Sequence, residues 1–273
     1  MELASCSIKR SPSWWKTLKL IPNYIKLSIV RSSEFKFSFY SYLFLYFAQI
    51  GFYLLFWNLV QPPEINGWSK EACFLMTGFA TLNIALQELV WATGMIDQMI
   101  LKGDLMVVLV RPENSYFGLV LRRMGAMAVI PACLGLLVVS ITLWMYFEWN
   151  LVQLSFASLI CMMGAICMRA LMLCVNSLGF KFGRVTALKS FVLSSRDLSR
   201  YPLAILPFSF QTLLSSLFPV LLISNWPTMF LLEDDIYEML KLFGLSSLVC
   251  LAWILTAVFV WRRGLKNYEG QSL

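Results

Sequence analysis

Few side chains in this sequence are suited to acid–base, nucleophilic or metal chemistry. The 273 residues contain no histidine, which excludes a Ser-His-Asp triad and removes the most common metal ligand. Neither a Gly-Lys dipeptide nor a GxGxxG pattern occurs, so the chain has no phosphate-binding loop of its own. The acidic stretch LLEDDIYEM, residues 231–239, offers carboxylates for a metal, although a solvated acidic loop is the simpler interpretation. We therefore predict no catalytic, cofactor-binding or metal-binding residues, and no enzyme activity in the chain itself.

Two charged residues, Glu88 and Arg169, lie inside stretches that are otherwise apolar. A charge at the centre of a membrane costs about 2.5–3.5 kcal/mol on insertion scales, so such residues usually face the interior of a helix bundle or a water-filled cavity. We hypothesise that Glu88 and Arg169 pair or line the same vestibule. The alternative is that each side chain reaches separately toward the inner headgroups.

The overall composition indicates an integral membrane protein. Hydrophobic residues make up 59% of the chain and charged residues 14%, whereas soluble domains average about 45–50% and about 25%. The net charge of +7 comes from basic residues that flank the apolar segments, which favours a membrane surface over nucleic acid as the partner. The seven cysteines include no CxxC pair, so small buried apolar residues are a better interpretation than a metal site.

The apolar segments predict an all-α protein with six transmembrane helices within residues 37–262. The expected spans are residues 37–60, 72–93, 117–147, 151–180, 203–224 and 240–261, with a cytoplasmic tail at 263–273. Pro202 directly precedes the fifth span, which contains Pro207 and Pro219. We expect it to be kinked or broken, with room for a re-entrant segment just after it.

The distribution of lysine and arginine predicts that both termini are cytoplasmic. Nineteen of the 22 basic residues fall on the side that contains residues 1–36, 97–123, 181–200 and the tail, and two fall on the other side. Residues 1–36 form the N-terminal cytoplasmic segment. Within it, SWWKTLKLIPNYIKLSIV has apolar residues every three or four positions and lysines between them, which predicts an interfacial amphipathic helix. Packing of that helix on a partner protein is the alternative.

The stretch ILKGDLMVVLVRPENS, residues 100–115, holds a short apolar run on the predicted cytoplasmic side. Six helical residues cover only about 9 Å, too little to cross a membrane. Asp104 is placed to cap a helix that begins after it, and Pro112 disfavours helix at Arg111. The apolar surface of this short helix must contact lipid headgroups, the protein's own bundle or a soluble partner, and the pattern alone leaves the three open.

Three stretches resemble motifs of the type-two exporter class of ABC transporter permeases. KGDLMVVLVRPENS is similar to its Gly-x-Leu-x-x-x-Leu-x-Arg-Pro pattern. SRYPLAIL, from Ser199, resembles its Arg-Tyr-Pro-Leu opening of the fifth span, and WRRGLKNYEG, from Trp261, its closing Arg-Gly-Leu-x-x-Tyr. The three occur in the family's order. The residues that match the first motif, with the Asp104 cap, are candidates for coupling to an ATPase: Gly103, Asp104, Leu105, Leu109, Arg111 and Pro112.

The resemblance implies a permease subunit that forms half of the export pathway in a bacterial cytoplasmic (inner) membrane. It implies two copies of a separate P-loop ATPase, which would bind ATP and Mg²⁺, and a second permease, identical or related. It also places the substrate path near spans one, two and five. The alternative function is an ATP-independent transporter or channel, and we also weighed a membrane-embedded enzyme and a non-transporting assembly subunit. The aromatic, apolar spans suit a lipid-like or amphipathic cargo, but lipid-facing helices need the same residues.

Overall fold

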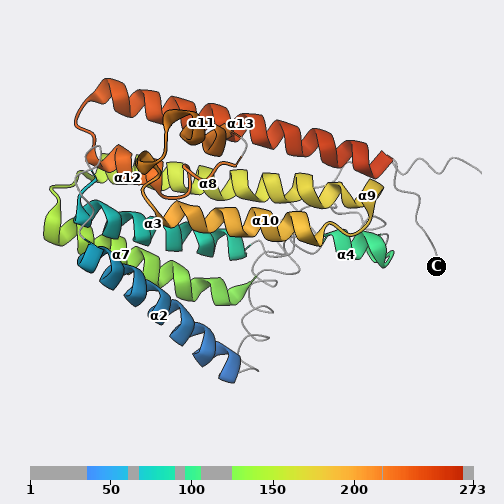
Figure 1. Ribbon diagram of the computed structural model, residues 1–273, viewed down its shortest axis with the longest axis horizontal. Coiled ribbons are helices and arrows are strands. Elements are labelled where there is room, and N and C mark those ends of the chain that lie inside the picture. The colour runs from blue at the N-terminus through green and yellow to red at the C-terminus, as the bar shows by residue number, and fades with distance from the viewer. Residues whose placement is uncertain (1–35, 61–67, 90–95, 106–124, 217, 267–273) are drawn as a thin grey trace, which may run out of the picture.

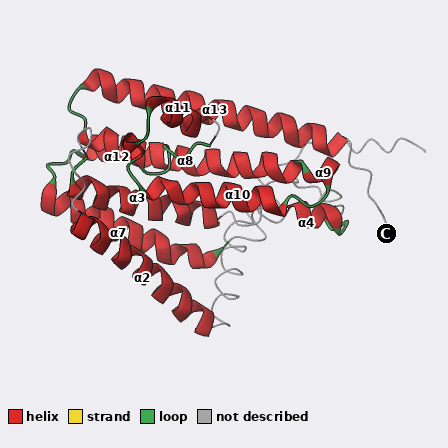
Figure 2. Cartoon of the chain, viewed as in Figure 1, coloured by secondary structure: helices red, strands yellow, loops and turns green. Residues whose placement is uncertain are grey.

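The structure is a computed structural model that describes residues 36–60, 68–89, 96–105, 125–216 and 218–266. Figure 2 shows that helices dominate these residues. The longer ones are α2 (Lys36–Val60), α3 (Lys70–Leu89), α7 (Val129–Tyr146), α8 (Leu151–Ser177), α10 (Thr186–Asp197) and α13 (Ile236–Lys266). Shorter ones are α4 (Ile96–Leu101), η2 (Ala126–Ala128), α9 (Gly179–Phe182), η3 (Leu198–Arg200), η4 (Leu203–Ile205), α11 (Phe208–Ser216) and α12 (Asn225–Leu232). The prediction of an all-α fold is confirmed for the described residues.

The long helices lie side by side, with α3 and α8 at the centre (Figure 1). α3 packs on α7 and α8, and α13 packs on the other side of α8. Contact between α3 and α7 is close because Gly78 and Gly135 lie in the interface. A Cβ on Gly135 would lie 2.7 Å from the backbone nitrogen of Leu82. Small residues allow helix backbones to approach each other where the surrounding solvent is lipid.

Five described helices are long and apolar enough to cross a membrane: Lys36–Val60, Lys70–Leu89, Val129–Tyr146, Leu151–Phe182 and Ile236–Lys266. They correspond to five of the six expected spans. α7 begins later than the expected third span, whose first residues, 117–124, lie outside the described part of the chain, as does the end of the second, 90–93. The predicted amphipathic helix in residues 1–35 also lies outside it.

The expected fifth span, residues 203–224, is broken in the structure. η4 and α11 are followed by a turn at residues 219–224 and by α12. The prolines supply the reason, because none of them can donate a helix hydrogen bond. Side chains bond the irregular backbone instead: Asn225 Oδ1 accepts from the Leu203 nitrogen at 2.9 Å, and Gln211 Nε2 donates to the Leu206 oxygen at 2.8 Å. Irregular backbone at membrane depth requires such partners.

Residues 181–200, which the sequence predicted as a connection on the cytoplasmic side, contain the packed helix α10 in the structure. α10 packs along α8, with Val192 in the cluster that Met168 and Met172 form. η3 then brings Arg200 against Tyr53 of α2. α10 buries one face and exposes the other, so it lacks the continuous apolar run by which a span is recognised.

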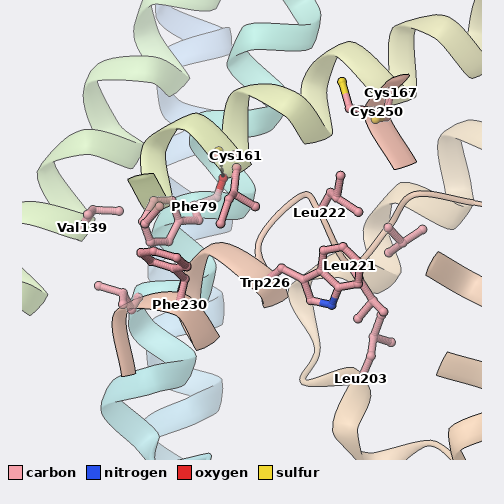
Figure 3. Close-up of a cluster of buried hydrophobic side chains, with 14 of the residues drawn as sticks. Phe79, Val139, Cys161, Cys167, Leu203, Leu221, Leu222, Trp226, Phe230 and Cys250 are labelled. Atoms are coloured by element: carbon pink, nitrogen blue, oxygen red, sulfur yellow. Dashed lines mark hydrogen bonds between the residues drawn. The ribbon is translucent and has the colours of Figure 1, made fainter. Parts of the chain in front are cut away.

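The largest buried cluster lies where α12 and the turn before it meet α3 and α8. Figure 3 shows Trp226 beside Leu221 and Leu222, and Phe230 close to Phe79. The turn approaches α8 at Gly164, where a Cβ would lie 2.3 Å from the Leu222 oxygen. The turn and α12 are therefore part of the core. We refer to this end of the bundle as the α12 end and to the opposite end as the α4 end.

Candidate functional site

The first coupling candidates lie at the α4 end, on a connection that is anchored to the bundle. α4 ends at Leu101, and Gly103 follows with a φ of 74°, a left-handed conformation that suits glycine. Leu105 is 1% exposed and packs in one cluster with α4 and with Trp261 of α13. The apolar run was expected to contact lipid headgroups, the protein's own bundle or a soluble partner. Leu105, its first residue, contacts the bundle.

The other candidates in this stretch are only partly described. Asp104 is exposed and comes directly before Leu105, which is helical, so its position suits the predicted cap. Leu109, Arg111 and Pro112 lie outside the described residues. Their roles in ATPase coupling remain predictions.

An ion pair that sequence reasoning missed holds α4 to α10. Lys189 Nζ donates to Asp97 Oδ1 at 2.7 Å, and the Asp97 nitrogen donates to Asn176 Oδ1 of α8 at 3.4 Å. Asp97 lies eight residues before Leu105 and, like it, is 1% exposed. The available signal was an acidic residue between the apolar residues Ile96 and Met99. α4, α8 and α10 therefore meet at one buried residue, Asp97, whose carboxylate bonds α10 and whose backbone nitrogen bonds α8.

Glu88, at the α4 end of α3, faces α2. Its carboxylate accepts hydrogen bonds from the hydroxyls of Tyr42 and Tyr46, the latter at 2.8 Å. The two tyrosines are one helical turn apart and their rings are in contact, with centroids 4.8 Å apart. The pair therefore fastens the first membrane-capable helix to the second.

Arg169 belongs to a buried polar ladder between α3 and α8. Its Nη2 donates to Gln87 Oε1 at 3.3 Å, and Gln87 Nε2 donates to Asn83 Oδ1 at 2.7 Å. Asn83 Nδ2 then donates to the Cys161 oxygen at 2.6 Å. Buried polar groups need such partners because water does not reach them.

Glu88 and Arg169 are thus connected through neighbouring positions of α3. Gln87 bonds Arg169 on one side of the helix, and Glu88 bonds the α2 tyrosines on another. A direct pairing of the two charges stays a prediction. The contacts that the structure does show join α2, α3 and α8 at similar depth.

Arg200 was not recognised as a buried group from the sequence, because it falls in the segment that the basic residues assigned to the cytoplasmic side. The guanidinium carbon lies 4.8 Å from the centroid of the Tyr53 ring. An arginine that follows an amphipathic helix and precedes Tyr-Pro was the available signal. Among the described residues, no group of three histidine, cysteine, aspartate or glutamate side chains is placed to hold a metal ion.

Five apolar helices that are long enough to cross a membrane, with buried polar contacts between them, indicate a multi-pass membrane protein. The chain belongs to the ABC-2 family transporter proteins, because the sequence model of that family matches residues 43–272. Neither the curated proteins nor the solved structures contain a match to the chain. Family membership supports a permease role and implies, for the family in general, an ABC ATPase as partner.

Proposed function

We propose that this protein is the transmembrane subunit of an ATP-driven exporter and forms half of its translocation pathway. The observation that carries the proposal is the family match, which covers all five membrane-capable helices except the first residues of α2. The complex would contain two such permeases, identical or related, and two copies of a separate ATPase. ATP and Mg²⁺ would bind to the ATPase, since this chain has no phosphate-binding loop.

The charges at the two ends of the described bundle support a cytoplasmic α4 end. Basic residues gather there, on the connections, on α9, on the first turn of α10 and near the end of α13: Lys102, Lys181, Arg184, Lys189, Arg262, Arg263 and Lys266. The α12 end carries Glu233, Asp234, Asp235 and Glu238 close to Lys241. By the positive-inside rule, the α4 end and both termini would lie on the cytoplasmic side of a bacterial inner membrane. With α10 and α11 counted together as one interrupted crossing, six crossings result.

The anchored connection at the α4 end supports a coupling role for the residues that follow it. Leu105 and Asp97 fix the connection to α8, α10 and α13, as described above. A soluble partner that binds residues beyond Leu105 would therefore act on three packed helices and not on a free loop. Mechanical coupling of this kind needs a rigid element that connects the two sites.

The surface of the bundle supports both lipid contact and a second permease. α2 and α13 are mostly exposed along their length, and the exposed side chains of α2 include Phe44, Phe47, Phe52 and Leu59. Exposed apolar area of this extent is covered by lipid or by another protein. A dimer would leave part of each helix against lipid.

Purification of the complex tests the proposal. We expect a P-loop ATPase to co-purify with the chain in near-equal amount, and Arg111→Glu to abolish that association without loss of membrane insertion. The matched control is Arg263→Glu, an exposed arginine near the same end of the bundle. A chain that purifies alone, with transport that is indifferent to ATP, would favour an ATP-independent transporter or channel. Retained association in Arg111→Glu would place the ATPase contact elsewhere.

A further inference from the structure

Arg200 is a buried charge in the half of the bundle nearer the α12 end. Its side chain is 2% exposed and lies over Tyr53, which stands seven residues before the end of α2 at Val60. Seven helical residues span about 10 Å, so Arg200 lies within the length of the apolar helix. A charged residue at membrane depth is expensive and usually serves a function.

The guanidinium group of Arg200 has unused hydrogen-bond donors. Among the residues that the structure describes, neither Nε nor Nη1 has a hydrogen-bond partner. The nearest acid is Asp197, whose Oδ1 lies 4.0 Å from Nε and whose side chain is 59% exposed. That distance is too long for a hydrogen bond, and an exposed carboxylate compensates a buried charge weakly.

Within the described part of the chain, three other buried donors on α2, α10 and η3 have no hydrogen-bond partner. They are Ser199 Oγ, directly before Arg200, Arg196 Nε, four residues earlier, and Nε1 of Trp57, whose ring adjoins that of Tyr201. The Ser199 carbonyl does not serve them, because Ser224 Oγ and Asn225 Nδ2 already donate to it. The region therefore has an excess of donors, three of them on the two guanidinium groups, and an unpaired buried donor costs free energy. An anion is the ligand that satisfies such a set.

Aromatic rings adjoin the donors. The Tyr201 ring lies 6.3 Å from that of Tyr53, 6.4 Å from that of Phe56 and 6.1 Å from that of Trp57, measured between centroids. Tyr201 is 41% exposed, so this wall continues from the buried guanidinium to the surface of the bundle. An apolar or aromatic body can stack there while its polar group points inward.

We propose that Tyr53, Trp57, Ser199, Arg200 and Tyr201 form a binding site, the Arg200 site, for the anionic group of an amphipathic molecule. A carboxylate, sulfonate or phosphate would accept hydrogen bonds from the Arg200 guanidinium, which suits planar or tetrahedral oxyanions. The apolar body would lie on the aromatic rings and leave toward the exposed side of Tyr201. A role of the site in export rests on the proposed function, whereas the binding itself does not.

A pair of probes that differ only in charge tests the Arg200 site. The full-length chain, purified in maltoside detergent, is titrated with 4-(1-pyrenyl)butyrate and with 4-(1-pyrenyl)butylamine. Energy transfer from tryptophan to pyrene reports binding, and competition by excess 4-phenylbutyrate, a carboxylate without pyrene, separates saturable binding from partition into the micelle. We expect saturable binding of the carboxylate only. Arg200→Gln should weaken it about tenfold or more, as the loss of a charge-assisted hydrogen bond does.

Three further variants keep the result interpretable. Ser199→Ala and Trp57→Phe each remove one donor and keep the shape of the site, so each should weaken binding by a smaller factor even if Arg200→Gln fails to fold. Arg262→Gln, an exposed arginine at the α4 end, should leave binding unchanged. Equal binding of the amine and the carboxylate, or an affinity that none of the three site variants changes, would overturn the proposal.

The source of the anion is resolved by the same titration in nanodiscs. If phosphatidylglycerol displaces pyrenebutyrate where phosphatidylcholine does not, the site takes an anionic lipid headgroup. If the two lipids give the same affinity, it takes a soluble amphiphile. The assay contains no ATPase, so a failure of the ATPase to co-purify would leave this result unaffected, and the two proposals fail separately.

Discussion

Lys189 of α10 and Asp97 of α4 form an ion pair in which Nζ lies 2.7 Å from Oδ1 and the carboxylate is almost fully buried. The pair joins the connection that carries the coupling candidates to the helix that leads to Arg200. α10 contains only 12 residues, so about 18 Å of helix separates the two regions. A displacement of α4 would therefore act directly on the helix that precedes the Arg200 site.

Removal of one member of this pair should destabilise the protein. Asp97→Asn removes the carboxylate that bonds the largely buried Lys189 ammonium, and the loss of one partner of a buried pair typically costs about 3–5 kcal/mol. We expect a lower midpoint of thermal unfolding in detergent for Asp97→Asn and for Lys189→Gln. The exchanged pair Asp97→Lys with Lys189→Asp should recover part of the loss.

The matched control for this pair is Lys241→Gln. Lys241 also bonds an acid, Glu238 at 2.9 Å, but both side chains are exposed. Exposed pairs contribute about 0–1 kcal/mol, so the midpoint should move little. An equal shift in Lys241→Gln and Lys189→Gln would show that burial of the Asp97 pair is not what stabilises the α4 end.

Leu105→Ala should weaken both the α4 end and the proposed coupling. The side chain is buried against α4 and α13, and Leu→Ala changes in a packed core cost about 2–5 kcal/mol. We expect reduced thermal stability together with reduced co-purification of the ATPase. Leu101→Ala, at an exposed position of α4, is the control and should change neither measurement.

Loss of the Glu88 carboxylate should loosen α2. Glu88→Gln replaces charge-assisted hydrogen bonds from Tyr42 and Tyr46, worth about 1.5–3 kcal/mol, by neutral ones worth about 0.5–1.5 kcal/mol. Faster proteolysis or hydrogen exchange within α2 would report it. The combination Glu88→Arg with Arg169→Glu tests direct pairing: if it rescues neither single variant, the separate contacts seen here carry the effect.

The apolar runs predicted most of the fold, because lipid imposes length and hydrophobicity on any helix that crosses it. α2, α3, α8 and α13 lie where those runs indicated. The prolines likewise indicated the break after Pro202. α10 was not recognised because half of its surface is polar, and its stability comes from packing on α8, which no local pattern reveals.

The buried contacts followed sequence reasoning less closely, since they depend on which helices become neighbours. Glu88 and Arg169 were identified as intramembrane charges by their apolar surroundings. The partner of Glu88 is Tyr46 on α2, and the partner of Arg169 is Gln87 on α3. Each partner lies on a neighbouring helix, so spacing in the sequence does not identify it. Asp97 and Arg200 lie in segments that were assigned to the cytoplasmic side, and their burial was not predicted because burial is a property of the tertiary fold.

The close approach at Gly164 makes a final prediction that connects packing to the Arg200 site. A methyl group at Gly164 would lie 2.3 Å from the Leu222 oxygen, a backbone atom that cannot rotate away. Gly164→Ala should therefore displace the turn at residues 219–224, at a cost of about 1–3 kcal/mol for overpacking. Ser224 and Asn225 at the end of that turn hold the Ser199 carbonyl beside Arg200. We expect lower thermal stability and weaker binding of pyrenebutyrate.

Gly244→Ala provides the control, because a Cβ at this helical position meets nothing within 4 Å. There the substitution should stabilise α13 by up to about 1 kcal/mol and leave binding unchanged. If Gly164→Ala lowered stability but left the affinity for the probe intact, the turn would not position Arg200, and the contacts of η3 with α2 and α3 would have to hold it alone.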